Sequence, residues 1–276
     1  MIAAPRQRWF FVLGLAAVAA GFLLPQVWLL SLSLKSKAGM FEYPPTWIPR
    51  ATSVANYRFV LMQSQVPWYL WNSLIVAVFA SAATLAVAAP AAYVLSRERF
   101  SGRTPLLASL LVIQMVSPVI LLVPIYGMIE RLGLIDTRAG LILVYAAMQV
   151  PFTVWVLKNF FDAVPASIFE AARLDGATRA RTFREIILPI IAPGLGATVV
   201  FNLAAYWSEF CLALVLLDSQ ARYTMPLGLF SFQSGYDTDW HLLAAASFIA
   251  LVPVIAVFVV LQRYFVAGLT AGAVKG

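Results

Sequence analysis

The sequence predicts an all-α membrane protein with six transmembrane helices, and two observations carry this prediction. The chain of 276 residues is 62% hydrophobic and only 11% charged, with a mean hydropathy of +0.87, which lies well outside the balance of soluble domains. Six windows also have the roughly 20 apolar residues that a helix needs to cross a hydrocarbon core of about 30 Å. We place them at Trp9 to Ser31, Tyr69 to Leu95, Pro105 to Ile129, Gly140 to Phe160, Leu195 to Leu217 and Leu242 to Phe265.

The first window could be mistaken for a secretory signal peptide, because Arg6 and Arg8 precede it and small residues lie within it. Its apolar run continues past the alanines at 16–20 and is longer than an ordinary signal-peptide core. We therefore expect an uncleaved first span. No period of 20 to 50 residues recurs along the chain, so we expect a single transmembrane domain over residues 1–276.

Basic residues in the loops predict the orientation, because loops rich in lysine and arginine are retained in the cytoplasm. With a cytoplasmic N-terminus, twelve of the 19 Lys and Arg residues lie inside, and seven lie outside together with six acids. The net charge is then about +7 inside and about +1 outside. We expect both termini in the cytoplasm and three outer loops, at Leu32 to Trp68, Glu130 to Ala139 and Asp218 to His241.

The composition also excludes several activities. A single cysteine, Cys211, and a single histidine, His241, cannot form a disulfide or a Cys/His metal site within the chain. No G-x-x-x-x-G-K-[ST] motif is present, so the chain lacks this means of binding ATP. The net charge of +7 would indicate nucleic-acid binding only if the basic residues gathered on one soluble face. They follow the loops instead, and we expect no nucleic-acid partner.

A polar segment, EAARLDGATRARTFREIILPIIAP from Glu170 to Pro193, separates the fourth and fifth windows. Its local signals predict two short helices. Pro165 suits a first helical turn, and Ser167 with Glu170 has the spacing of a capping box. Gly176 can adopt the left-handed conformation that ends a helix, and Thr178 can cap the next one.

The first of these helices is amphipathic, and its apolar side can be used in two ways. Ile168, Phe169 and Ala172 share one side, while charged residues such as Glu170 and Arg173 border it. This side could seat in a groove on another protein. It could equally pack on the protein's own bundle or lie on lipid headgroups. The residues alone leave both alternatives open.

The polar segment resembles the EAA loop in permease subunits of binding-protein-dependent ABC importers. The similar residues are Glu170-Ala171-Ala172, Asp175-Gly176-Ala177, Phe183, Ile186, Leu188-Pro189 and Pro193. The resemblance covers nearly the whole chain. VANYRFVL at 54–61, SEFCLALVLL at 208–217 and QRYFVAGLTAGAVKG at 262–276 are similar to the smaller permease of maltose-type carbohydrate importers. The resemblance implies a type I importer permease in the bacterial cytoplasmic (inner) membrane.

The resemblance further implies a set of partners. They are a second homologous permease, two cytoplasmic ATPase subunits that bind ATP and Mg²⁺, and an extracytoplasmic solute-binding protein, within membrane lipid. This chain would hold no cofactor and catalyse no reaction. Its EAA loop, about 161–194, would couple to the ATPase through Glu170, Ala171, Ala172, Asp175 and Gly176.

Two further contacts follow from the same resemblance. The cytoplasmic tail, about 266–276, would reach the ATPase dimer, with Leu269, Thr270, Gly272 and Lys275 as candidate contacts. The third outer loop would extend toward the binding protein, with Gln233, Tyr236, Asp237 and Trp240 as candidate contacts.

Polar residues in the fifth window suggest a pathway for the solute. Asn202 and Glu209 are seven residues apart, so a continuous helix would place them on one face with Tyr206. They could hydrogen-bond sugar hydroxyls, with Tyr206 or Trp207 stacking on a sugar ring. Alternatively, this polar face contacts the partner permease, since buried polar groups often join helices.

Two other classes of function are alternatives to a subunit that imports a sugar-like solute. A self-contained secondary transporter would tend to carry ionisable residues in several spans, whereas only Glu209 is convincingly intramembrane here. A membrane-embedded enzyme would need paired carboxylates, a histidine cluster or a Ser/His pair, and the chain shows none of these patterns. The sequence does not distinguish among sugars and sugar derivatives as the solute.

Overall fold

The structure is a computed structural model that describes residues 5–233 and 238–273. These residues are helical apart from turns, loops and an isolated bridge between Gln233 and Thr238, which confirms the predicted all-α fold. The α-helices are α1 (Pro5–Ser33), α2 (Ala55–Met62), α3 (Val66–Arg97), α4 (Arg103–Gln114), α5 (Pro118–Arg131), α6 (Arg138–Asp162), α7 (Ala166–Leu174), α8 (Arg179–Arg181), α9 (Leu188–Ile190), α10 (Ala192–Ser208), α11 (Cys211–Leu216), α12 (Met225–Phe230) and α13 (Trp240–Ala273). Short 3₁₀ or π segments are η1 (Ala38–Phe41), η2 (Thr182–Ile187) and η3 (Gln220–Arg222).

Within the described residues, four helices are long and apolar enough to cross a membrane by themselves: α1, α3, α6 and α13. Two bent pairs would each add a span if the pair is counted as one. These pairs are α4 with α5, bent by 100°, and the Arg179–Ile190 segment with α10, bent by 76°. The structure therefore contains four to six candidate spans, and each predicted window contains a helix.

Two predicted windows are not continuous helices. The third breaks before Pro118, because Ser117 has an extended backbone with ψ of 130° and a residue before proline is disfavoured in the helical conformation. The fifth was predicted to run unbroken to Leu217, and this was wrong. Helix α10 ends at Ser208, Glu209 is extended with ψ of 129°, and α11 begins at Cys211.

The contacts divide the chain into two compact units. The smaller comprises residues 1–67 and 228–252, as far as these are described. In it, the amide of Asn56 donates to the carbonyls of Ser33 and Lys35, each at 2.8 Å. The buried Lys35 ammonium donates to the Thr46 carbonyl at 2.5 Å and lies 5.1 Å from the ring centre of Trp28. The middle of the first predicted outer loop, at Thr46, and the start of α2, at Asn56, are thus fixed to the end of α1.

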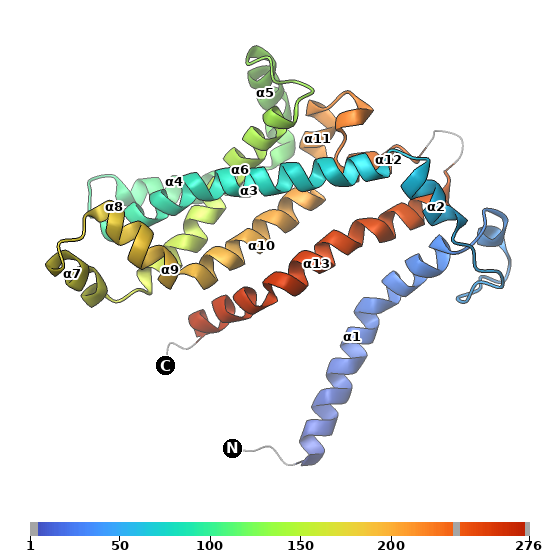
Figure 1. The fold of residues 1–276 in the computed structure, drawn as a ribbon, viewed down its shortest axis with the longest axis horizontal. Helices are drawn as coiled ribbons and strands as arrows, with labels where there is room; N and C mark the ends of the chain where they lie inside the picture. The colour runs from blue at the N-terminus through green and yellow to red at the C-terminus, as the bar shows by residue number, and fades with distance from the viewer. Residues whose placement is uncertain (1–4, 234–237, 274–276) are drawn as a thin grey trace. The chain divides into compact units, whose positions relative to one another are not determined.

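The larger unit comprises residues 68–227 and the described residues from 253 onward. Helix α6 packs against α4 and α10, and α11 packs against α5 and α6 (Figure 1). A Cβ atom at Gly194 would lie 2.4 Å from the ring of Phe160. Glycine therefore allows α10 to approach α6 closely, as small residues do between membrane helices. The prediction of one domain over residues 1–276 stays a prediction.

Two buried clusters fill this larger unit. One surrounds Tyr145 of α6 and includes Leu216 of α11. The other surrounds Leu157 and Phe161 near the end of α6 and includes Ile187 of η2. Figure 1 shows α7 to α9 at one end of α3 and α11 near the other. The second cluster therefore fixes the predicted EAA loop to the ends of α3 and α6.

Candidate functional site

The segment after α6 forms a short helix, a left-handed turn and a second helical stretch. Gly176 has a φ of +73°. The N–H of Ala177 donates to the carbonyl of Ala172 at 2.9 Å, and that of Gly176 donates to Arg173 at 3.1 Å, which is the pattern of a Schellman motif. The Oγ1 atom of Thr178 then accepts from the N–H of Arg181 at 3.3 Å. The predictions for Gly176 and Thr178 are confirmed.

The start of α7 differs from the prediction. The helix begins at Ala166, after an extended Pro165 with ψ of 142°, and no side chain caps it. Ser167 therefore lies inside the first turn, where its hydroxyl cannot occupy the N-cap position. The predicted capping box of Ser167 with Glu170 is wrong.

The two sides of α7 have different surroundings. Ala172 is buried, and Ile168 and Phe169 pack as half-buried side chains against the second cluster. The apolar side of the helix therefore packs on the protein's own bundle, which decides between the alternatives left open by the sequence. The other side exposes Glu170, Ala171, Arg173 and Asp175, and Leu174 is 89% exposed.

A mixed polar and apolar pocket of about 260 Å³ lies between α7 and the end of α3. Two of its lining residues, Glu98 just after α3 and Arg179 at the start of α8, form an ion pair at 2.9 Å. Glu170 is among its lining residues and is exposed. The lining residues are Tyr93, Arg97, Glu98, Ala166, Phe169, Glu170, Arg173, Ala177, Arg179 and Thr182.

A second pocket, of about 170 Å³, lies in the helical bundle of the larger unit and combines aromatic and amide side chains. The rings of Tyr145 and Tyr206 stack in it, with centroids 5.4 Å apart and planes 11° from parallel. Gln149 also lines it, and its amide has no hydrogen-bond partner among the described residues. The lining residues are Ile113, Gln114, Val116, Pro118, Tyr145, Met148, Gln149, Ala205, Tyr206, Glu209 and Leu212.

Sequence analysis missed Tyr145, Gln149 and Gln114 in this pocket. A signal for the two glutamines was present, because an amide inside an apolar window is expensive in lipid and tends to face a cavity. Tyr145 gave no comparable signal, since tyrosine is common in membrane helices near interfaces.

Glu209 lines the same pocket but is occupied by its own chain. Its carboxylate accepts from the hydroxyl of Tyr145 at 2.6 Å and from the backbone N–H groups of Leu212 and Ala213 at 2.8 and 3.2 Å. These two N–H groups belong to the first turn of α11, where a helix leaves donors unsatisfied. Glu209 thus fixes the start of α11 to α6. The prediction that it continues the helix of Asn202 was wrong, because α10 ends at Ser208.

Asn202 is fully buried, and its Oδ1 atom accepts from the hydroxyl of Thr153 at 3.1 Å. Thr153 is in α6, so this hydrogen bond joins two helices of the same chain. The solute contact predicted for Asn202 therefore finds no support in this conformation.

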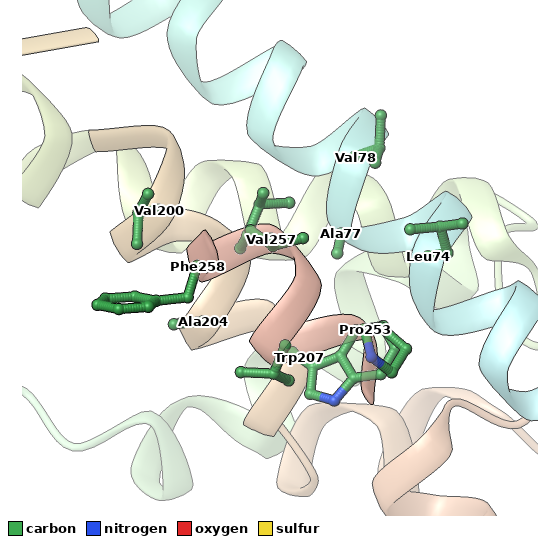
Figure 2. A pocket seen from close by; sticks show the side chains of 11 residues that line it. Leu74, Ala77, Val78, Val200, Ala204, Trp207, Pro253, Val257 and Phe258 are labelled. Atoms are coloured by element: carbon green, nitrogen blue, oxygen red, sulfur yellow. The ribbon is translucent and has the colours of Figure 1, made fainter. Parts of the chain in front are cut away.

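Trp207 lines a different pocket from its neighbour Tyr206. Figure 2 shows Trp207 of α10 beside Pro253 of α13, in a cleft of about 130 Å³ whose lining is almost wholly apolar. Leu74 and Val78 of α3 lie along the same cleft (Figure 2). The predicted pathway residues therefore separate into a polar pocket with Tyr206 and Glu209, and an apolar cleft with Trp207.

A polar link also fixes the end of α11. Asp136, in the loop before α6, accepts from the N–H of Ser219 at 3.0 Å and its hydroxyl at 2.5 Å, and pairs with Arg222 at 3.3 Å. The N–H of Asp136 donates to the carbonyl of Leu216 at 2.8 Å. Burial opposes ionisation of Asp136, but the hydrogen bonds and Arg222 outweigh it, so its pKa lies below the ordinary value.

The predicted contacts in the outer loop and the tail are only partly described. Gln233 is exposed beside its bridge to Thr238, and Trp240 is 50% exposed at the start of α13. Tyr236, Asp237 and Lys275 lie outside the described residues. Leu269, Thr270 and Gly272 belong to the last turns of α13, where only the backbone is described.

The comparison with protein families decides the class of the protein. Residues 1–271 match the family described as the binding-protein-dependent transport system inner membrane component. The chain belongs to this family. The permease is therefore a multi-pass inner-membrane subunit of a binding-protein-dependent ABC importer and not an enzyme. This membership excludes the alternative of a self-contained secondary transporter.

Relatives with similar sequences agree with this assignment. The permease is 35% identical over 256 residues to the diacetylchitobiose uptake system permease protein DasC of Streptomyces coelicolor, with 93% of each chain covered. It is 33% identical over 254 residues to the sulfoquinovosyl glycerol transport system permease protein SmoH of Agrobacterium fabrum, covering 92% and 89% of the two chains. It is 32% identical over 273 residues to the trehalose/maltose transport system permease protein MalG of Thermococcus litoralis, covering 98% of each.

A solved structure supports the fold. A chain of a bacterial ABC transporter involved in the import of the acidic polysaccharide alginate matches the permease with a TM-score of 0.80. The match covers 96% of the permease and 99% of that chain, at 22% sequence identity. At this identity the likeness establishes the importer permease fold alone.

Proposed function

We propose that the permease forms half of the translocation pathway for a sugar or sugar-like solute and couples to cytoplasmic ATPase subunits through α7. A second homologous permease would supply the other half of the pathway. An extracytoplasmic binding protein would deliver the solute, and two ATPase subunits would bind ATP and Mg²⁺. The proposal places both termini and the α7 loop in the cytoplasm, as the distribution of basic residues predicts.

The observation that carries the coupling role is the two-sided environment of α7. Its apolar side packs on the bundle, so a force applied to α7 would act on the ends of α3 and α6. On its other side, the carboxylate of Glu170 is exposed beside Ala171 and Leu174. The apolar side chain of Leu174 is almost fully exposed. A charged group next to an apolar surface suits a partner groove with a basic residue and an apolar floor.

Sugar-like solutes are supported by the relatives and by the second pocket. DasC, SmoH and MalG are named for diacetylchitobiose, sulfoquinovosyl glycerol and trehalose/maltose, which are saccharides or contain a sugar. In the pocket, the amide of Gln149 offers a donor and an acceptor beside the stacked and largely buried rings of Tyr145 and Tyr206. Ring faces and amides are suited to a solute with both C–H faces and hydroxyl groups.

The untested contacts with partners belong to the same proposal. Gln233, Tyr236, Asp237 and Trp240 would face the binding protein, and Leu269, Thr270, Gly272 and Lys275 would reach the ATPase dimer. ATP binding would close that dimer and draw the α7 helices of the two permeases together. Shifting the populations of two conformations of the bundle from a ratio of 1:99 to 99:1 requires a ligand to bind one conformation more tightly by about 5.5 kcal/mol. ATP must therefore favour one conformation by at least this amount.

The test is Glu170→Ala in the permease co-expressed with its partner subunits and reconstituted in liposomes. Glu170 would supply a charge-assisted hydrogen bond of about 1.5–3 kcal/mol, so we expect a roughly 10- to 100-fold loss of ATPase stimulation by loaded binding protein. Uptake of a labelled saccharide should fall in parallel, with membrane insertion unchanged. Glu185→Ala is the matched control, because Glu185 is also exposed and, within the part of the chain that the structure describes, forms its ion pair with Arg181 of its own segment.

Two results would count against the proposal. If Glu170→Ala keeps full stimulation with the ATPase bound, α7 is not the coupling helix. If the purified permease carries a saccharide across liposomes without ATP or other subunits, the need for ATPase partners fails.

A further inference from the structure

We propose that Arg97 is a positioning residue that ties the coupling helix α7 to the ends of α3 and α6, so that the three move as one body. This inference rests on the coupling role proposed for α7. Arg97 is the last residue of α3. Its Nη2 atom donates to the carbonyls of Phe161 and Val164, the latter at 2.7 Å. Its guanidinium lies 4.1 Å from the ring centre of Phe169 in α7.

Of the two carbonyls that Arg97 binds, that of Phe161 lies in the last turn of α6 and that of Val164 lies just after the helix ends. The last carbonyls of a helix have no N–H partner within it, and they carry the negative end of its dipole. A cation at this position is therefore favoured twice, by hydrogen bonding and by charge. Val164 is also the buried residue at which the chain turns from α6 toward α7. Arg97 thus fixes the connection between the two helices as well as the end of α6.

The face of the guanidinium makes the third contact. A planar cation above an aromatic ring is attracted by the ring's negative face, by about 0.5–2 kcal/mol depending on burial. Phe169 is held in turn by Tyr93 of α3, with ring centroids 6.2 Å apart and planes 28° from parallel. Arg97 and Tyr93 are four residues apart on α3, so both contact Phe169 from the same helix face.

The surrounding aromatic rings extend this attachment. Tyr93 also contacts Phe161 and Phe183, with centroid distances of 5.6 and 5.1 Å. Phe161 is fully buried in α6, and Phe183 lies in η2 after the left-handed turn. Both arms of the α7 loop are therefore fixed to α3 through rings, and Arg97 is the charged member of this group that also binds backbone atoms.

A lysine at position 97 could not form this combination of contacts. The guanidinium donates along its edge while its face stacks on a ring, whereas an ammonium has no flat face and concentrates its charge at one point. Arg97→Lys therefore keeps the charge and most of the length but loses the combination of edge and face. We expect that variant to loosen α7 relative to α3 without removing it from the membrane.

The experiment uses the complete transporter reconstituted with its ATPase subunits and binding protein. In Arg97→Lys, stimulation of ATPase activity by loaded binding protein should fall by about five- to tenfold. Basal hydrolysis and recovery of the ATPase on purification should stay within about twofold of wild type. Arg99→Lys is the matched control, because Arg99 is an exposed arginine two residues away. Phe169→Leu should reproduce the defect, and the double variant should lose little more than either single one, because both remove the same contact.

The outcomes separate this inference from the proposal on which it rests. Wild-type stimulation in Arg97→Lys overturns the positioning role. Loss of ATPase recovery in proportion to stimulation also overturns it, because Arg97 would then matter only for stability. If Glu170→Ala uncouples the complex while Arg97→Lys does not, the inference alone fails. If Glu170→Ala also leaves stimulation intact, the coupling role of α7 fails first.

Discussion

Helices α7 and α11 are both short and follow a break in a longer helical run, but they are attached differently. Helix α7 has nine residues and rests on apolar and aromatic contacts along one side, with its other side exposed. Helix α11 has six residues, of which Leu212, Ala213 and Leu216 are buried in the first cluster. It also has a polar contact at each end, from the Glu209 carboxylate to the N–H of Leu212 and from the N–H of Asp136 to the carbonyl of Leu216. Helix α7 is thus attached along one side, whereas α11 combines apolar burial with a polar contact at each end.

This difference predicts how each helix responds to substitution. The attraction between two apolar atoms is small, about 0.1–0.2 kcal/mol per pair, and many such pairs together stabilise α7. Loss of one such contact should have a smaller effect than loss of the turn that aims the helix. Hydrogen bonds to a charged group are worth about 1.5–3 kcal/mol each, and the Glu209 carboxylate accepts two from the first turn of α11. Loss of the Glu209 carboxylate should therefore lower the stability of the complex.

The largest effect is expected for Gly176→Val. The left-handed φ of +73° strains any residue with a Cβ atom, and a β-branched one most. The space around Gly176 is open, so the cost comes from the backbone and is of order 1–3 kcal/mol. We expect the turn to change conformation and re-aim α7, with nearly complete loss of ATPase stimulation and uptake.

Gly176→Asn is the matched control, because asparagine tolerates the left-handed region far better than valine. It should keep most of the stimulation. Equal loss in Asn and Val variants would show that the side chain at 176, rather than the turn, disturbs docking. Normal transport in Gly176→Val would contradict the importance of the turn.

An intermediate effect is expected for Glu209→Gln. The amide offers one acceptor oxygen where the carboxylate offered two, and its NH₂ group would face a donor at Leu212, Ala213 or Tyr145. We expect the complex to assemble but to melt at a lower temperature, with changed uptake kinetics because Glu209 also lines the tyrosine pocket. Gln149→Leu should change saccharide uptake without this loss of stability. Loss of assembly in Glu209→Gln with normal uptake per complex would favour an interface with the partner permease.

The contrast between the two helices also shows what the sequence can predict. Long apolar runs identified the helical windows, and local chemistry identified the turn at Gly176 and the cap at Thr178. The break at Glu209 was missed because it depends on the hydroxyl of Tyr145, which is 64 residues away. Arg97 was counted only as a positive charge in a loop, since nothing near it in the sequence indicates Phe169 or the end of α6. Composition and periodicity could not predict contacts between residues that are far apart in the sequence.

The smallest effect is expected for Asp136→Asn, and its pH dependence provides the test. Asparagine keeps the left-handed backbone of residue 136, where φ is +54°, but removes the charge that Ser219 and Arg222 stabilise. Because the folded-state pKa of Asp136 is lowered, its contribution to stability is fully present above the ordinary pKa of about 4 and is lost as the pH falls through the folded value.

The gap in melting temperature between wild type and Asp136→Asn should thus be constant from about pH 7 to pH 5 and should narrow below about pH 4. We expect the gap near neutral pH to correspond to about 1–2 kcal/mol, since the site is partly open to solvent. Thermal unfolding of the purified complex across this range measures it, with Glu130→Gln as a control for loss of an exposed carboxylate nearby, in the last turn of α5. A gap that persists or widens toward pH 3.5 would show that α11 depends on the shape of residue 136 rather than on its charge.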